Sequence, residues 1–337
     1  MLENDTRNQH FISQSEQRLN ALNPHAPQAK QRIYSFEVID RENYKLALED
    51  LRGRPIESNL LRLDLFSFDV PDESRLRLNF ESQFQKYEGN IKSHTESLLS
   101  KLNAGNYDVR TEVINMFAAK LLNFVRNPFS VVKVLNTFPG LAHYHPTDPV
   151  LLADYRRIVT GRKPQRAHLC AQLDISEMQY DEWLGVLFML MVPMADGQPS
   201  FFQDMIRRLL EDRKTYIAAF IGEYDSARCL LSDRGVSQPI ADGPHTAFSF
   251  NVRANAFMDF VFVDPATMVQ GNASPEFIAQ AVAAWERLPK QLNVTFVRNN
   301  IEMLARFNRR AVEQCYKRVF CSVKDGIVLT APSLEAG

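Results

Sequence analysis

The sequence offers a few residues whose side chains could do chemistry, and they are spread over both halves of the chain. The earliest is His10, because an imidazole titrates near neutral pH and can act as a general acid or base. Gln14 follows four residues later, so one turn of helix would place its amide on the same face, where it could orient the ring. The alternative for His10 is a histidine that only packs or caps.

Two carboxylates, Glu81 and Glu88, lie on one predicted helix, where they flank Phe84 and Tyr87. Seven residues of α-helix span roughly 10.5 Å, which is too far for both side chains to bind one metal ion directly. Either carboxylate could serve as a single acid or base, and we take Glu88 as the candidate. The competing interpretation is that both pair with arginines of neighbouring helices.

Arg126 lies at the end of a predicted helix that Asn127 and Pro128 terminate. A guanidinium there could present its fork of N–H donors to a phosphate or a carboxylate. A purely structural reason exists as well, because a cation near a helix C-terminus is stabilised by the helix dipole. Both interpretations stay open.

Asp233 belongs to the motif Ser232-Asp233-Arg234-Gly235, directly after a strand-like run. Active-site carboxylates often lie at strand ends, where the backbone is rigid and the side chain is exposed. A turn formed by Asp, Arg and Gly is the alternative.

A basic helical segment near the C-terminus contains Arg306 and Asn308 together with two further arginines. Such a segment either contacts a polyanionic substrate or forms a surface face that pairs with acidic neighbours. We take Arg306 and Asn308 as candidate substrate-binding residues.

Two segments have the spacing of a known kind of site, a metal-binding loop and a helix-turn-helix, but we do not assign either function to them. His143 and His145 have the spacing of some metal-binding loops, but no carboxylate cluster accompanies them, so no metal ligands are predicted. Residues 165–184 imitate a helix-turn-helix, which makes a DNA-binding regulator a third hypothesis for the function. The second helix would present Glu177 and Asp181 to DNA phosphates, so a helical hairpin in the core is the better interpretation.

The composition places the chain among ordinary globular proteins. Its 337 residues are 45% hydrophobic and carry a net charge of −1, so any phosphate-binding site has to be a local patch. Isolated cysteines argue against a disulfide framework and fit a reducing compartment. The N-terminus lacks an apolar signal segment, and the longest apolar run, residues 186–194, is too short to span a bilayer. We expect a cytoplasmic protein that does not enter a membrane.

The elements that must position these residues are predicted to form one α+β domain over 1–337, with a strand and loop region (1–70), a helical region (71–213) and a last region of strands and helices (214–337). Strands are expected near 32–39, 44–49, 215–222, 227–233, 246–252, 256–264 and 328–329. Helices are expected near 80–105, 109–126, 148–160, 165–174, 177–192 and 200–213, with two more after Pro275. We expect a predominantly helical protein in which the N-terminal hairpin and the strands of 214–263 form one antiparallel sheet.

Taken in order, these motifs resemble an uncharacterised bacterial family whose members open with H-[HF]-[VI]-P-Q-x-x-L-x-x-F. The segment NQHFISQSEQRLN is similar to that opening, with Ser13 in the place of its proline. FESQFQKYEGNI resembles the glutamate-bearing helix of the family, and NFVRNP resembles its helix that ends in arginine and proline. LLSDRGV is similar to a strand-end motif usually written S-D-N-P, and ARFNRRAVEQCYKRVFCS is similar to the closing asparagine helix.

The resemblance implies a site assembled from both ends of the chain, and members of the family are frequent neighbours of phage-defence genes. The first hypothesis is therefore a nuclease-type or nucleotide-directed hydrolase that acts as an effector in bacterial antiphage defence. His10 would be the acid or base, Gln14 would orient it, Glu88 and Asp233 would supply carboxylates, and Arg126 would bind the phosphate. His10, Arg126 and Asp233 should then converge in one cleft.

The second hypothesis is a non-catalytic binding or scaffold subunit of a defence complex. An exposed apolar patch on the helices of 165–213 would favour it. The expected ligand is nucleic acid or a nucleotide under the first hypothesis and a protein partner under the second. The sequence identifies no cofactor, and Mg²⁺ is the ion considered for the hydrolase.

Overall fold

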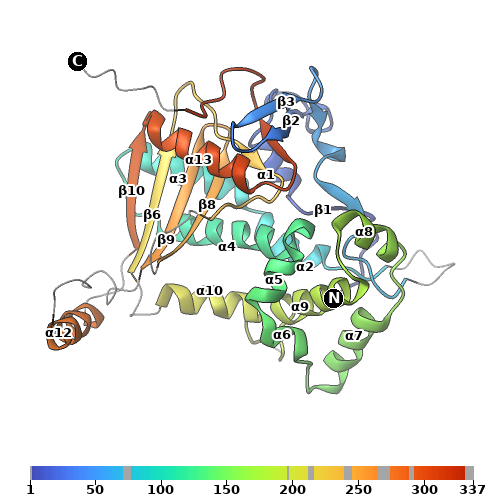
Figure 1. Ribbon diagram of the computed structural model, residues 1–337. Helices are drawn as coiled ribbons and strands as arrows, with labels where there is room; N and C mark the ends of the chain where they lie inside the picture. The colour runs from blue at the N-terminus through green and yellow to red at the C-terminus, as the bar shows by residue number, and fades with distance from the viewer. Residues whose placement is uncertain are drawn as a thin grey trace, which may run out of the picture.

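The computed structural model describes residues 2–70, 77–195, 197–211, 216–238, 245–263, 274–287 and 292–330. Its architecture is α+β, as the sequence predicts, with a helical middle region between strands from both ends of the chain (Figure 1). One continuous buried apolar cluster contains residues from Leu2 to Phe320 and therefore joins these regions. Within the described ranges no helix is long and apolar enough to cross a membrane.

One mixed sheet has the strand order β10 (Leu292–Arg298), β6 (Tyr216–Glu223), β9 (Ala256–Val263) and β8 (His245–Arg253). The last three strands are antiparallel, whereas β10 runs parallel to β6. Alternate side chains of a strand point to opposite faces. Phe260 of β9 accordingly stacks on Phe117 of α4 (Arg110–Arg126), and Phe257 stacks on Phe307 of α13 (Ile301–Gln314), so the sheet lies between these helices (Figure 1).

The N-terminal hairpin belongs to a different sheet, which corrects the expectation of one antiparallel sheet. Its strands β2 (Arg32–Asp40) and β3 (Lys45–Leu48) pair with each other, and β4 (Arg54–Pro55) also pairs with β2. The C-terminal β11 (Arg318–Cys321) pairs with β2 and, beyond it, with β7 (Leu231–Ser232). Because β11 and β7 complete this sheet, only β7 among the described strands of 214–263 shares a sheet with the hairpin.

A third, two-stranded sheet pairs β1 (Asn8–His10) with β5 (Leu61–Leu63) in antiparallel register. The short helix α1 (Gln14–Arg18) follows β1. Its first turn is capped by Ser13, whose hydroxyl accepts a hydrogen bond from the Glu16 N–H at 3.1 Å. Ser13 therefore starts the helix that carries Gln14.

The helices of the middle region pack around α9 (Glu177–Met191), which is buried without interruption from Trp183 onward. Trp183 donates its indole N–H to the Val125 carbonyl at 2.8 Å, and Tyr180 donates its hydroxyl to the Leu65 carbonyl at 2.6 Å. The remaining α-helices of the described residues are α2 (Glu81–Glu88), α3 (Ile91–Asn103), α5 (Val131–Thr137), α6 (Pro139–His143), α7 (Pro149–Thr160), α8 (Arg166–Leu173), α10 (Phe201–Glu211) and α12 (Pro275–Glu286).

The predicted helix boundaries are close to the observed ones, with a few differences. The helix expected over 80–105 is two helices, α2 and α3, which Gly89 and Asn90 separate. β1, β10, α5 and α6 were not predicted. The strand expected at 328–329 is wrong, because β11 ends the pairing in the described part of the chain. Residues 212–215, where a predicted helix ends and a predicted strand begins, lie outside the described residues.

Candidate active site

His10 is half-buried at the end of β1 and is neutral at pH 7. Burial and the positive charge of Arg126 lower its pKa from 6.5 to about 4. Hydrogen bonds with the backbone of Ile56 and Glu57 favour the protonated ring and oppose this shift, and since Nε2 has no partner, we assign these bonds to Nδ1–H. Nε2 therefore carries a free lone pair at neutral pH, which is the state that a general base requires.

His10 ends β1 and Gln14 begins α1, so the helical turn expected to place both side chains on one face is not formed. Gln14 contacts a cation that flanks the imidazole. Its Oε1 accepts a hydrogen bond from Nη2 of Arg18 at 2.5 Å. The charge of Arg18 contributes to the lowered pKa of His10. Gln14 thus holds a cation near His10, which differs from the predicted role of orienting the ring.

Arg126 is 1% exposed and brings α4 against α2. Its Nη2 forms an ion pair with Glu88 and donates to Oδ1 of Asn123 at 3.1 Å. The guanidinium packs on the ring of Phe84, 5.1 Å from the centroid. The structure thus brings three of the predicted residues together, His10, Glu88 and Arg126.

Glu81, which the sequence places one turn before Phe84, belongs to the same cluster. Burial raises its pKa to about 7, the nearby Glu88 adds to the shift, and Arg126 opposes it. Its Oε1 is buried and has no hydrogen-bond partner. A carboxyl with such a pKa is protonated in part of the molecules at neutral pH and can donate a proton.

We call these five residues the His10 cluster: His10, Arg18, Glu81, Glu88 and Arg126. Four of them are half-buried, whereas Arg126 is almost fully buried. Several polar atoms of the cluster are buried without a partner, namely Nε2 of His10, Oε1 of Glu81 and Nε of both arginines. Buried polar atoms are nearly always paired in folded proteins, so unpaired ones gathered in one place indicate a ligand site.

Comparison of the chain with protein-family models, with curated proteins and with solved structures found no match. The family resemblance therefore depends on the motif residues quoted from the sequence. The chemistry of the His10 cluster is argued from its geometry and electrostatics.

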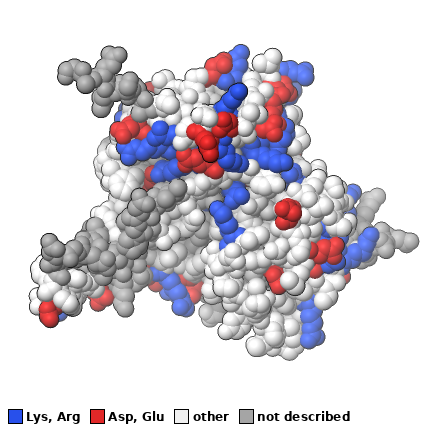
Figure 2. Space-filling model, in the orientation of Figure 1, with Lys and Arg blue, Asp and Glu red and all other residues white. Residues whose placement is uncertain are grey.

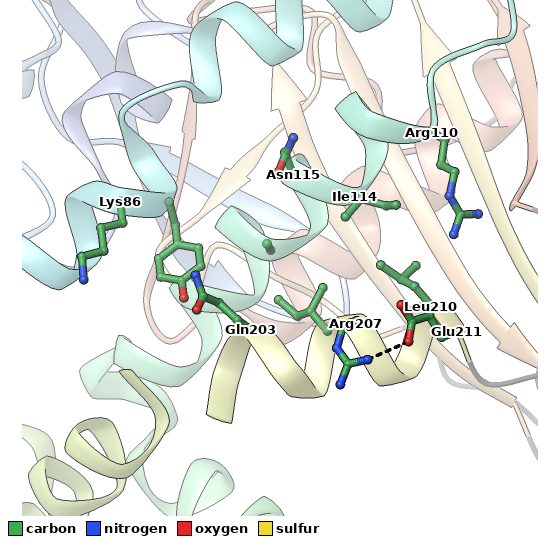
Figure 3. A pocket seen from close by; sticks show the side chains of 11 residues that line it. Lys86, Arg110, Ile114, Asn115, Gln203, Arg207, Leu210 and Glu211 are labelled. Atoms are coloured by element: carbon green, nitrogen blue, oxygen red, sulfur yellow. Dashed lines mark hydrogen bonds and ion pairs between the residues drawn. The ribbon is translucent and has the colours of Figure 1, made fainter. Parts of the chain in front are cut away.

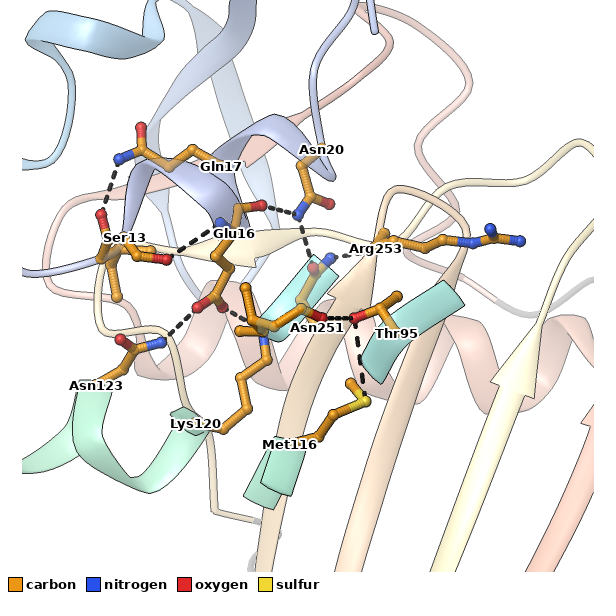
Figure 4. A network of polar contacts seen from close by, with 12 residues as sticks. Ser13, Glu16, Gln17, Asn20, Thr95, Met116, Lys120, Asn123, Asn251 and Arg253 are labelled. Carbon is orange, nitrogen blue, oxygen red and sulfur yellow. Dashed lines mark hydrogen bonds and ion pairs between the residues drawn. The ribbon is translucent and has the colours of Figure 1, made fainter. Parts of the chain in front are cut away.

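A fully buried ion pair adjoins the cluster. Together with Asn123, the paired residues Glu16 and Lys120 form what we call the Glu16 network (Figure 4). Glu16 of α1 pairs with Lys120 of α4, and both side chains are at most 1% exposed. Asn123 completes the network by donating to Oε2 of Glu16 at 2.6 Å, while its own oxygen accepts from Arg126. Each carboxylate oxygen and the ammonium group has a partner, so this network stabilises the packing of α1 on α4.

Asp233 directly follows β7, as the sequence predicts, but its carboxylate faces the backbone. The carboxylate accepts hydrogen bonds from the N–H groups of Tyr316, Lys317 and Arg318 at 2.6–2.9 Å. Its carbonyl accepts from Asn127 at 2.9 Å, which fixes the turn next to the end of α4. The charge of Arg126 therefore acts on His10, whereas the Asp233 carboxylate binds the backbone at the start of β11, and the common cleft of the three residues stays a prediction.

The two residues predicted to bind substrate, Arg306 and Asn308, are paired with other groups of the protein. The amide of Asn308 is buried, accepts from the Leu230 N–H and donates to the carbonyls of Arg228 and Val328. Arg306 is exposed on α13 and pairs with Glu302 one turn earlier. Neither side chain contacts the His10 cluster.

A groove of about 420 Å³ lies between α2, α4 and α10 (Figure 3). Its apolar wall includes Ile114 and Leu210, and basic side chains such as Lys86 and Arg110 line its edge. Arg207, at the same edge, is paired with Glu211 at 3.0 Å. None of the predicted site residues lines this groove.

Of the two segments that imitate known sites, residues 165–184 form the predicted helical hairpin, which is α8 and α9. The described residues contain no group of three or more His, Cys, Asp or Glu that could hold a metal ion. In the helix-turn-helix imitation, Arg166 of α8 pairs with Glu177 and Asp181 of α9, so the acidic side chains join the two helices. α9 itself is a core helix.

Sequence reasoning missed Arg18 and the Glu16 network. Lys120 carried a usable signal, because a lysine inside the run FAAKLLNFV predicts a buried cation that requires a partner. No sequence signal identifies Glu16 as that partner, since 104 residues separate the two.

Proposed function

We propose that this protein is a phosphodiester or nucleotide hydrolase that uses acid–base catalysis in the His10 cluster. The observation that carries the proposal is a pair of groups in complementary protonation states beside one arginine. His10 is neutral with a free Nε2, and Glu81 has a pKa of about 7. Groups whose pKa values are pushed in opposite directions are typical of acid–base pairs.

In the proposed reaction, Nε2 of His10 takes a proton from water as the water oxygen attacks the phosphorus atom. The bond between phosphorus and the leaving oxygen breaks, and protonated Glu81 gives its proton to that oxygen. Negative charge on the phosphoryl oxygens is stabilised by Arg126 and Arg18. We assign the direct phosphate contact to Arg18, because it is the more exposed of the two and Arg126 already pairs with Glu88.

The proposal includes the wider hypothesis that the family resemblance suggests, a nuclease-type effector in bacterial antiphage defence. Its support is the order of the motifs and the position of His10, Glu88 and Arg126 in one cluster. Nucleic acid or a nucleotide is the substrate under this hypothesis. Mg²⁺ enters the test as a variable, because metal ions can stabilise the charge of a transferring phosphoryl group.

The test is a hydrolysis assay with the purified full-length protein. Labelled RNA, labelled DNA and nucleotides are incubated with and without Mg²⁺, using wild type, His10→Ala and the control His25→Ala, whose histidine lies in an exposed loop. We expect a loss of at least about 100-fold in kcat for His10→Ala and no loss for the control. Turnover that survives His10→Ala, or no turnover by a folded wild type, contradicts the proposal.

A second candidate function is the binding or scaffold subunit, which one observation favours. A groove of about 480 Å³ on the outer side of α10 is lined by the apolar side chains Phe201, Met205 and Leu209 and by the charged Asp204 and Arg208, and Phe201 is 45% exposed. An exposed apolar stripe on a helix is typical of a protein-binding face. Replacing the exposed Phe201 by Asp should then abolish co-purification of a partner encoded nearby while the fold is kept, and unchanged co-purification would exclude this face.

A further inference from the structure

A second group of positive charges lies beside the His10 cluster and takes no part in the reaction proposed above. We call it the basic strip, and it consists of two half-buried arginines and two exposed lysines: Arg62, Arg234, Lys133 and Lys317. Within the described ranges no carboxylate lies at ion-pair distance from any of these four side chains. Nε of both arginines is buried without a hydrogen-bond partner.

Aromatic rings connect one end of the strip to His10. The Arg62 guanidinium lies over Phe11, the residue after His10, and over Phe129, at 5.9 and 5.8 Å from the ring centroids. Phe129 stacks on Tyr316 at 4.2 Å with an interplanar angle of 9°. The Lys317 ammonium lies 5.6 Å from the Tyr316 centroid, so these rings and cations form one continuous surface.

The Asp233 turn places the other cations of the strip. The Asp233 carboxylate binds the N–H groups of Tyr316 and Lys317, and Arg234 is the next residue of the same turn. Arg234 and Lys133 of α5 line one small cavity. Gly235, at φ +71°, lies so close to Ile12 that a Cβ atom would come within 2.5 Å of its Cδ1, which fixes the turn against the segment after His10.

The electrostatics of the strip suit an anion. Burial lowers the pKa of Arg62 and of Arg234 and the nearby arginines add to the shift, while the charge of Asp233 opposes it without forming an ion pair with either guanidinium. The fork of a guanidinium matches the oxygens of a phosphate. Figure 2 shows basic side chains reaching into the waist between the upper and the lower half of the molecule.

We propose that the basic strip binds consecutive phosphate groups of a nucleic-acid strand and guides the strand to the His10 cluster. The inference rests on the proposed function and deepens it, because it names a strand as the substrate instead of a free nucleotide. The half-buried arginines would each contact a phosphate, while the exposed lysines would contribute charge along the backbone.

The test measures binding separately from hydrolysis. Fluorescence anisotropy of a labelled 20-nucleotide RNA and of the matching DNA is recorded from 50 to 200 mM salt with wild type, Arg62→Ala/Arg234→Ala and the control Arg52→Ala/Arg156→Ala, which removes two exposed arginines elsewhere. We expect at least a tenfold weaker affinity for the Arg62→Ala/Arg234→Ala variant and a smaller salt slope, by roughly 0.7 for each lost phosphate contact with a single strand. The control should bind as wild type does.

Two further arms keep the outcome decisive. Lys133→Ala/Lys317→Ala changes only exposed side chains and should weaken binding by about fivefold even if the arginine variant is unstable. A mononucleotide and inorganic phosphate serve as competitors. If the protein binds the 20-nucleotide strand no more tightly than the mononucleotide, the proposal of a strand as the ligand is wrong and a free nucleotide replaces it.

The binding assay also separates this inference from the proposed function. If wild type hydrolyses a small phosphodiester but wild type and both strip variants bind the strand equally, or none binds it, the inference fails and the function survives. If wild type hydrolyses nothing but the strip variants lose strand binding, the inference survives and the function fails.

Discussion

The Glu16 network and the His10 cluster lie side by side on α4 and differ in how completely their charged atoms are paired. In the network, both oxygens of Glu16 have partners, Lys120 and Asn123. In the cluster, Nε2 of His10 and Oε1 of Glu81 have none. The first arrangement is what stability requires of buried charges, and the second is what a site that must exchange protons requires.

Asn123 is the point where the two regions meet. Its amide N–H donates to Glu16 and its amide oxygen accepts from Arg126. The Glu16 network, whose charged atoms are paired, therefore holds the arginine of the His10 cluster in place. This connection predicts that changes in the network act on stability, whereas changes in the cluster act on chemistry and on its pH dependence.

The largest expected effect is on stability, from Lys120→Ala. The change leaves the Glu16 carboxylate buried without its cation and should lower the free energy of unfolding by about 3–5 kcal/mol, measured by urea denaturation. The control is Lys92→Ala, which breaks an exposed lysine–glutamate pair on α3 and should change little. Equal losses for the two variants would contradict the distinction drawn here between buried and exposed pairs.

Asp233→Ala is expected to have the next largest effect. It leaves the backbone N–H groups of residues 316–318 without their acceptor and should lower the free energy of unfolding by about 3 kcal/mol. Asp233→Asn keeps one acceptor and should lose less. A hundredfold loss of kcat at unchanged stability would instead return Asp233 to the catalytic group.

Glu81→Gln should change the pH dependence of the free energy of unfolding by about 3 kcal/mol. Because the folded-state pKa of Glu81 is raised to about 7 from 4.5, the folded wild type retains a proton that the unfolded chain has lost, and its stability falls as the pH rises through this window. The variant lacks this term, so it should gain stability relative to wild type from pH 4.5 to pH 8 in urea titrations.

The same substitution tests the acid role in kinetics. We expect kcat/KM of wild type to decline above about pH 7, as Glu81 loses its proton, and the Glu81→Gln variant to show a low rate without that decline. A variant that keeps the alkaline decline would show that another group is the acid.

The smallest effect is expected for Arg306→Ala. Its ion pair with Glu302 is exposed and lies within one helix, so neither the melting temperature nor strand affinity should change measurably. Weaker strand binding in this variant would extend the basic surface to α13, as the sequence interpretation proposed.

The sequence predicted the helical middle region well, because apolar residues at helical spacing and capping signals are local. Ser176 and Gln179 form a capping box at the start of α9, and residues 254 and 255 join β8 to β9 in a hairpin, so both features depend on residues close together in the sequence. The sheet assignment was wrong because strand pairing is not local: β11 reaches β2 across almost the whole chain, and β10 joins β6 in parallel.

For the candidate site as well, local features could be predicted from the sequence and long-range contacts could not. The sequence by itself selected His10, Glu88 and Arg126, because residue type and position on an element can be read locally. Only the tertiary structure decided that these three residues meet and that Glu81 and Arg18 join them. It also decided that the side chains of Asp233 and Asn308 form hydrogen bonds with backbone groups. The physical reason is that a buried side chain's protonation state and role depend on its desolvation and on its partners, and both are set by residues distant in the sequence.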